Sequence, residues 1–341
     1  MSPSTLALLL LGFVFSFLYI FRVTVTSYRK NDRKHPPGPR ALPIIGNLHI
    51  LGKLPHQTLY QLAKKYGPIM SIRLGCVPTI VVSSPQAAEL FLKTHDAIFA
   101  NRPHLKALDY MSFGNKSMSF SPYGSYWRSA RKWCTLHILS ASKVESFAPI
   151  RRAEVGSLVA SLKKASEADE LVDLTMKVEE VVEDIMFKII LGRSKDDRFD
   201  FKPLIKELLT LLGTFNLSDF VPYLAPLDLQ GLKGKLKRVS DGLDRLLEII
   251  IDEREQEARE QEKQHWDFVD VMLTLLNKPL NPNDHEEQPY IVDRSIIKAI
   301  ITDMIVASFD PSATMIDDWA MGANLEEEIE NPSKSNSKHF P

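Results

Sequence analysis

Apolar residues recur every three or four positions through most of the chain after about residue 138, and that spacing predicts a mostly helical protein. One stripe consists of Leu232, Leu236, Val239, Leu243, Leu246 and Ile250, and its charged C-terminal continuation is typical of a solvated helix end. A second stripe follows Asp293, a predicted N-cap, and consists of Ile296, Ile297, Ile300, Ile301, Met304, Ile305 and Phe309.

Strand-like patterns occur only near the N-terminus. The runs "IMSIRL" (69–74) and "TIVVS" (79–83) are joined by "GCVP", which predicts a β-hairpin. Ser84 and Pro85 then predict the cap and first turn of a helix. The expected fold class is therefore mostly α with a small N-terminal β-sheet.

The second helical stripe runs into a proline, in "DMIVASFDPSATMIDDWA" (303–320). Pro311 has no N–H for the carbonyl of Ala307, which costs roughly 3 kcal/mol in a helix interior. In one interpretation the helix ends near Phe309, Asp310 caps a second helix, and Pro311 takes the first helical position. In the other, a deliberate break presents Asp310 and the hydroxyls of Ser312 and Thr314 at a functional site.

The N-terminal segment has the composition of a membrane anchor. Residues 1–21 carry no charged side chain and are close to the roughly 17 to 25 residues that span a bilayer as a helix. Residues 22–39 are basic and then proline-rich, which places the following domain on the cytosolic side and predicts a stiff hinge. A cleaved signal peptide fits less well, because the charge follows the apolar run.

A second apolar stretch, "NLSDFVPYLAPLDLQGL" (216–232), is broken by two prolines. It fits two interpretations equally: a connection that packs in the core, or a second surface that dips into the edge of the bilayer.

Composition excludes several classes of function. The formal net charge of −1 over 341 residues does not indicate a nucleic-acid surface. The two cysteines, Cys76 and Cys134, are far apart and predict free thiols in a reducing compartment. The histidines lack metal-ligand spacing, and there is no GxGxxG, GxxxxGK, HExxH or GxSxG motif. We therefore expect neither a metal site built from side chains nor a nucleic-acid partner.

Ordered motifs carry a resemblance to a family. After the anchor come "PPGPRALPIIGN", "YGPIMSIRLG", "FANRP", "SPYGSYWRSARKWC", "DFVPYLAPLDLQG" and "ASFDPSAT", in that order. The chain resembles a cytochrome P450 of the plant microsomal class, over roughly the N-terminal two-thirds of such a protein. The resemblance implies that residues 40–321 are the N-terminal part of the catalytic domain. The segment 322–341 departs from the pattern, and we expect a frayed helix followed by disorder.

The resemblance implies a haem cofactor and candidate residues near it. Trp127 and Arg131 match the family's "WxxxR" pair, which donates hydrogen bonds to a haem propionate. Phe113 falls in the family's first substrate-contacting loop.

On the distal helix, the resemblance implies that Ala307, Ser308 and Phe309 face haem and substrate, Ala307 being a haem contact. Asp310 matches the acid of the family's proton relay. Pro311 stands where the relay threonine is expected, and Ser312 is the nearest hydroxyl that would replace it.

The resemblance implies a monooxygenase that hydroxylates a small lipophilic substrate with O2 and with electrons from a reductase, at the endoplasmic reticulum membrane. The family's iron-ligand segment FxxGxxxC and its ExxR pair do not occur in this sequence. The chain as written is therefore expected to be inactive. The alternative is a non-catalytic anchored product, from splicing, a pseudogene or an incomplete gene model, that acts only through binding partners.

Overall fold

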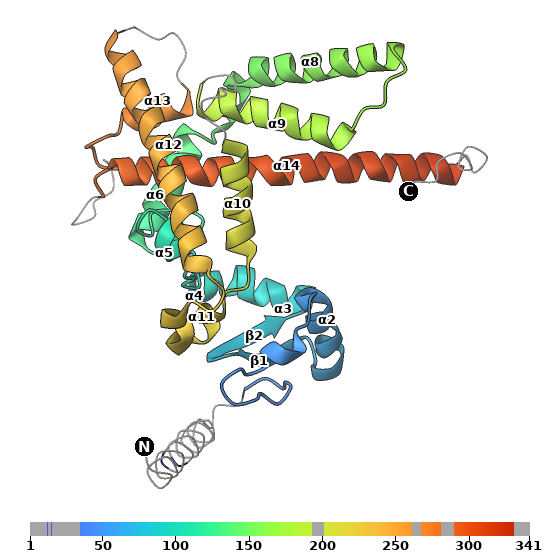
Figure 1. Cartoon of the computed structure of the whole chain (residues 1–341), viewed down its shortest axis with the longest axis vertical. Helices are drawn as coiled ribbons and strands as arrows, with labels where there is room; N and C mark the ends of the chain where they lie inside the picture. The colour runs from blue at the N-terminus through green and yellow to red at the C-terminus, as the bar shows by residue number, and fades with distance from the viewer. Residues whose placement is uncertain are drawn as a thin grey trace, which may run out of the picture. The chain divides into compact units, whose positions relative to one another are not determined.

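The computed structural model describes residues 35–192, 201–260, 267–280 and 290–330, together with Gly12 and Phe15. Side chains at 201, 202, 309, 310, 313 and 317–330 lie outside that description. The described chain is mostly helical with one two-stranded sheet, which confirms the predicted fold class (Figure 1). It forms two compact units. We call Met1–Asn101 with Phe215–Gly231 the sheet unit, and Arg102–Thr214 with Leu232–Pro341 the helical unit.

The predicted anchor, residues 1–21, lies outside the described residues apart from Gly12 and Phe15. Among the described residues, none of the helices combines the length and the apolar character needed to cross a bilayer.

The sheet unit contains a hairpin with short helices around it. Its elements are η1 (Leu48–Ile50), α2 (Pro55–Tyr66), β1 (Ile69–Leu74), β2 (Val77–Val82), α3 (Pro85–Glu89), η2 (Leu90–Thr94), α4 (Asp96–Phe99), α11 (Leu217–Phe220) and η3 (Pro222–Leu227). The strands pair antiparallel, with Ile69 opposite Val82. The hairpin prediction is confirmed. The predicted cap is confirmed too, because Ser84 Oγ accepts a hydrogen bond from the amide of Ala87.

The proline-rich segment before the hairpin lies along β1. The amide of Ser71 donates to the carbonyl of Pro37 at 3.0 Å, and Ser71 Oγ donates to the carbonyl of Pro36 at 2.9 Å. A Cβ on Gly38 would lie 1.8 Å from the carbonyl oxygen of Ser71, so only glycine permits this approach. The last residues of the predicted hinge are thus fixed to the sheet.

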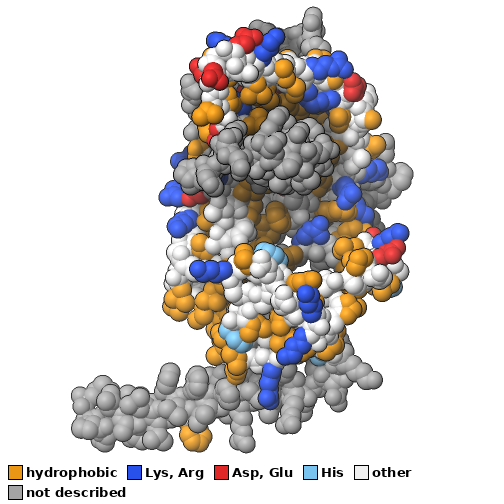
Figure 2. Space-filling model, turned by 90° about the vertical axis from the view of Figure 1, so that its right-hand side faces the viewer, with side chains coloured by type: hydrophobic (Ala, Val, Ile, Leu, Met, Phe, Trp, Pro, Cys, Tyr) orange, Lys and Arg blue, Asp and Glu red, His pale blue; other side chains and the backbone are white. Residues whose placement is uncertain are grey.

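The apolar stretch 216–232 belongs mainly to the sheet unit. The amide of Cys76, in the hairpin turn, donates to the carbonyl of Phe220 at 2.7 Å, and Val221 is fully buried. Tyr223, Leu227 and Leu229 are exposed. The stretch therefore packs through its first half and presents apolar side chains through its second. Figure 2 shows hydrophobic side chains at the surface in the lower part of the view, interspersed with Lys and Arg.

The helical unit is built around two long helices. Its elements are α5 (Leu108–Met111), α6 (Ser125–His137), α7 (Ala141–Ser146), α8 (Ala148–Glu167), α9 (Leu174–Ile190), α10 (Phe201–Gly213), α12 (Leu232–Glu260), α13 (Phe268–Leu273) and α14 (Arg294–Glu330). Helix α14 packs against α9, which packs in turn against α8, and α10 packs against α12. Figure 1 shows the other helices of the unit gathered around the N-terminal half of α14, while its C-terminal end extends beyond them.

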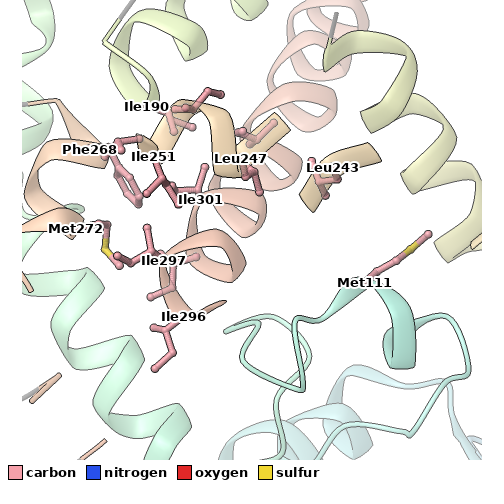
Figure 3. Close-up of a cluster of buried hydrophobic side chains, with 14 of the residues drawn as sticks. Met111, Ile190, Leu243, Leu247, Ile251, Phe268, Met272, Ile296, Ile297 and Ile301 are labelled. Atoms are coloured by element: carbon pink, nitrogen blue, oxygen red, sulfur yellow. The ribbon is translucent and has the colours of Figure 1, made fainter. Parts of the chain in front are cut away.

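The core lies where α12, α13 and the first half of α14 meet. Figure 3 shows Ile251, Phe268, Met272, Ile297 and Ile301 gathered in one cluster. The predicted stripe on α12 is confirmed except at one position: its buried residues are Leu232, Leu236, Val239, Leu243, Leu247, Ile250, Ile251 and Arg254. The stripe continues through Leu247, four residues after Leu243, so the predicted Leu246 is only partly buried.

Ion pairs also fix the first half of α14 to α12. Lys298, which is nearly buried, bonds to Asp244 at 2.7 Å and to Glu248. Arg294 bonds to Glu248 and, at 2.7 Å, to Asp252. The predicted N-cap is confirmed, because Asp293 Oδ1 accepts a hydrogen bond from the amide of Ile296 at 2.9 Å.

The predicted break at Pro311 is wrong, because α14 is continuous from Arg294 to Glu330 and contains Pro311. Asp310 therefore caps no second helix. A proline removes one backbone hydrogen bond, whereas the first half of α14 is already fixed by a buried stripe and by its ion pairs, so a local cost need not end the helix. The expected tail is helical as far as Glu330, and residues 331–341 lie outside the described residues.

Candidate functional site

The candidate residues of the helical unit come from three segments: residues 112–121, which we call the Phe113 loop, helix α6 and helix α14. Phe113 is partly buried against the core. Its backbone is left-handed, with φ of 48°, and the same holds for Gly114 and Asn115 at 76° and 63°. Left-handed backbone is unfavourable for residues with a Cβ, so the loop depends on contacts with its neighbours to keep this shape.

On α6, the two candidate donors lie beside each other. The indole N–H of Trp127 donates to the carbonyl of Met118 at 3.0 Å. The guanidinium of Arg131, which is exposed, lies 5.0 Å from the centroid of the Trp127 ring, a cation–π contact. The only N–H of the indole is therefore used by the Phe113 loop.

On α14, Ala307 is exposed and Ser308 is partly buried. The hydroxyl of Ser308 donates to the carbonyls of Met304 and Ile305 in its own helix. Ser312 is exposed and lies one turn further along, on the same face as Ser308. Phe309 and Asp310 belong to the helical backbone, and their side chains lie outside the described part of the chain.

The structure also reveals a residue that the sequence reasoning missed. Asp303 on α14 is 7% exposed. Its carboxylate accepts hydrogen bonds from Ser117 Oγ at 2.7 Å and from the amide of Met118 at 2.5 Å. It also accepts from the side chain and the amide of Ser119. The one signal in the sequence was an acid directly before Met304, a position of the predicted apolar stripe.

Burial dominates the electrostatics around Asp303. It raises the pKa of Asp303, against the opposing effect of the hydrogen bonds from Ser117, Ser119 and Met118. Burial, and then the charge of Asp303, raise the pKa of Tyr126 and raise the pKa of Cys134 to about 12. Cys134 is accordingly a buried thiol rather than a thiolate.

A second set of contacts lies around Lys116, in the middle of the Phe113 loop, and the start of α6. Lys116 pairs with Asp293 at 2.6 Å, and its carbonyl accepts from the hydroxyl of Tyr126 at 2.6 Å. Ser125 and Tyr290 share a hydrogen bond between their hydroxyls at 2.8 Å. The Phe113 loop is thus attached to both α6 and α14.

No cluster of three or more His, Cys, Asp or Glu residues suited to a metal ion occurs in the part of the chain that the structure describes.

Comparisons with known proteins place this chain in a family. The family model described as Cytochrome P450 matches residues 36–322, which is most of the chain. The chain belongs to the cytochrome P450 family, and haem is the cofactor of that family. The resemblance seen in the motifs is confirmed.

The relatives are plant proteins. Cytochrome P450 CYP736A12 of Panax ginseng is 54% identical over 297 residues, covering 87% of this chain and 59% of the relative. Cytochrome P450 71A22 of Arabidopsis thaliana is 34% identical and covers 98% of this chain and 67% of the relative. Cytochrome P450 71D8 of Glycine max is 37% identical, with 97% and 65% covered. The chain thus spans about three-fifths to two-thirds of the length of these relatives.

The described residues do not make a complete haem site. Iron in this family needs a cysteine thiolate. Cys134 is fully buried and protonated, and Cys76 is exposed and belongs to the sheet unit. The indole N–H of Trp127, for which the resemblance implies a propionate partner, donates to the carbonyl of Met118 in this structure. Among the described residues, neither cysteine is thus suited to hold iron.

Proposed function

We propose that this chain forms the N-terminal part of a haem-dependent monooxygenase. The enzyme hydroxylates a small lipophilic substrate with O2 and with electrons from a reductase. The observation that carries the proposal is the family match over residues 36–322. Bound haem supplies oxygen activation in such a protein. The protein's own residues supply the surfaces around it.

In this proposal the candidate residues keep the roles that the family implies. Trp127 and Arg131 would bind propionate oxygens, and the exposed guanidinium of Arg131 beside the Trp127 ring supports this role for the arginine. The indole N–H would have to exchange its bond to Met118 for one to the propionate. On α14, Ala307, Ser308 and Phe309 border haem and substrate, while Asp310 and Ser312 handle protons on the dioxygen side. Phe113 contacts substrate from its loop. Ser312 is supported as a proton donor by its exposed position one turn after Ser308.

We also propose that the protein is anchored at the endoplasmic reticulum by residues 1–21, with the domain facing the cytosol. The uncharged run and the basic residues after it support this orientation. The exposed apolar side chains of Tyr223, Leu227 and Leu229 support a second contact with the bilayer.

Spectra of the chain and of a chimera test the proposal. The 341-residue chain, reduced under carbon monoxide, is expected to show no thiolate-type absorbance band, because neither of its cysteines fits an iron ligand. A chimera extended by the C-terminal part of the ginseng relative is expected to show the band and reductase-dependent substrate oxidation. The matched control replaces the haem-ligand cysteine of the added part by serine.

Two outcomes count against the proposal. A chimera that folds and lacks the band would remove the case for a haem monooxygenase surface in residues 36–322. A band in the 341-residue chain alone would show that the assignment of both cysteines as non-ligands is wrong.

The second candidate is a non-catalytic anchored protein that acts by binding a reductase or a full-length relative. The buried Cys134 favours it, because its raised pKa keeps it a thiol, which is a poor ligand for iron. Apolar residues are exposed on α8 and after it, including Val155, Val159 and Leu171. Because exposed apolar surface promotes aggregation and proteolysis, degradation of the protein is the alternative to such a binding role. Co-purification with a reductase supports this candidate, whereas rapid loss of the protein in cells argues against it.

A further inference from the structure

One residue of the Phe113 loop, Met118, joins two helices through its backbone N–H and C=O groups. The amide N–H of Met118 donates to Asp303 on α14 at 2.5 Å, and the carbonyl of Met118 accepts from Trp127 on α6 at 3.0 Å. The side chain of Met118 is partly buried against the core. The position of the Trp127 indole is therefore linked to Asp303 through a single residue.

Asp303 gathers several donors at once. Besides Met118, it accepts from the hydroxyl of Ser117 and from both the side chain and the amide of Ser119. An ionised carboxylate offers about four acceptor sites, which suits such a set of donors. An asparagine at the same place offers one acceptor oxygen, and its NH2 group faces donors that it cannot satisfy.

The backbone of the loop needs this restraint. Phe113 and Asn115 both have φ in the left-handed region. Such a conformation costs on the order of 1 to 2 kcal/mol for each residue with a Cβ. Unfavourable backbone of this kind persists where surrounding contacts determine it. The contacts of Asp303 are attached four to six residues beyond Phe113, in the same short loop.

We propose that Asp303 is a positioning residue that fixes the shape of the Phe113 loop and, through the backbone of Met118, the orientation of the Trp127 indole. This inference rests on the proposed function, in which Phe113 contacts the substrate and Trp127 contacts haem. Asp303 then couples the substrate loop to the cofactor helix without touching either ligand.

Hydrogen exchange of the 341-residue chain tests the proposal. In Asp303→Asn, exchange of the Met118 and Ser119 amides is expected to speed up about tenfold or more, while amides in the α12 and α13 core keep their rates. The matched control is Asp244→Asn, which makes the same change at a carboxylate that bonds to Lys298 on α14. The control is expected to leave the loop amides unchanged.

The fluorescence emission of Trp127 reports on the environment of its indole. A general loss of stability in Asp303→Asn would not change the Trp127 contribution specifically. Asp303→Asn is expected to shift the fluorescence emission, and the shift is expected to vanish when Trp127 is replaced by phenylalanine in the same chain. A shift of equal size in both backgrounds would mean that other tryptophans respond, which overturns the link through Met118.

The other results of the exchange experiment also support or overturn the proposal. Unchanged loop exchange in Asp303→Asn, or equal acceleration throughout the helical unit, would overturn the proposal. If Asp303→Asn does not fold, Ser117→Ala removes one donor and leaves the carboxylate, and faster exchange confined to the loop then supports the proposal, whereas unchanged exchange overturns it. The exchange measurement needs no haem or substrate, so its failure is separate from a failure of the proposed function.

Discussion

Asp303 is a carboxylic acid enclosed by neutral donors, and its protonation is linked to stability. Because burial raises its pKa above the ordinary 3.8, the folded chain holds this proton more tightly than the unfolded chain does. Its favourable contribution to the free energy of unfolding is thus present below pH 3.8 and is lost as the pH rises through the raised pKa. Subtracting the Asp303→Asn variant isolates this contribution below neutral pH, since Tyr126 and Cys134, whose pKa values the charge of Asp303 also raises, titrate only at higher pH.

We expect the free energy of unfolding of wild type, relative to Asp303→Asn, to decrease as the pH rises from about 3.8 toward neutrality. Urea unfolding at a series of pH values measures the difference. A difference that increases with pH would mean that the hydrogen bonds from Ser117, Met118 and Ser119 outweigh burial, so that the pKa is lowered.

The two cysteines are expected to differ sharply in reactivity. Cys76 is exposed, whereas Cys134 is fully buried with its pKa raised from 9.0 to about 12. Such a rise reduces the thiolate fraction roughly a thousandfold near pH 8. A thiol reagent such as a disulfide of thionitrobenzoate should therefore titrate one thiol in the folded chain and two in denaturant. The Cys76→Ser variant should show none until it unfolds, and fast reaction of that variant would contradict the placement of Cys134.

At the scale of single residues, the sequence identified candidate residues by their type and motif, but it did not identify the groups to which they bond. Trp127 and Arg131 were found because their spacing matches a family motif. Asp303 was not found, because its partner Ser117 lies 186 positions away and no local pattern records that contact. The hydrogen bond from the indole N–H of Trp127 to the carbonyl of Met118 was not predicted either, because a motif specifies a donor and not its acceptor.

At the scale of elements, the hairpin was predictable and the continuity of α14 was not. The hairpin depends on neighbouring residues, alternating strands and a glycine turn, all visible in sequence. The continuity of α14 depends on contacts with α9 and α12, which outweigh the local cost of Pro311. Local helix propensity alone therefore predicted an end of the helix near Phe309, which is wrong.

The same reasoning makes Pro311→Ala a stabilising change. Pro311 is exposed, so alanine fills no cavity, and it restores an N–H for the carbonyl of Ala307. Alanine is favoured over proline in a helix interior by about 3 kcal/mol, which sets the upper limit of the expected rise in unfolding free energy. Urea unfolding and helical circular dichroism measure the effect. Ser312→Ala, one position on and also exposed, is the control, and an equal rise there would contradict the argument.

At the scale of the whole molecule, the segment 215–231 joins residues 35–101 in one unit although more than a hundred residues separate them. For the overlapping apolar stretch 216–232, the hydrophobic pattern alone fitted two interpretations equally, a connection that packs in the core and a surface that contacts the membrane. The structure shows why both descriptions had support: Val221 is buried and the carbonyl of Phe220 bonds to Cys76, while Leu227 and Leu229 are exposed.

The exposed half of that segment yields a prediction about membranes. Replacing Leu227 and Leu229 by serine should reduce binding of the chain without its first 34 residues to neutral phospholipid vesicles, because each buried leucine contributes on the order of 1.5 to 3 kcal/mol. Vesicle flotation measures the bound fraction. The control is the double change Val155→Ser and Val159→Ser on α8, which removes two exposed apolar side chains from the helical unit. If flotation falls equally in both variants, the vesicles bind exposed apolar surface in general, and the segment 215–231 is then only a core connection with an exposed edge.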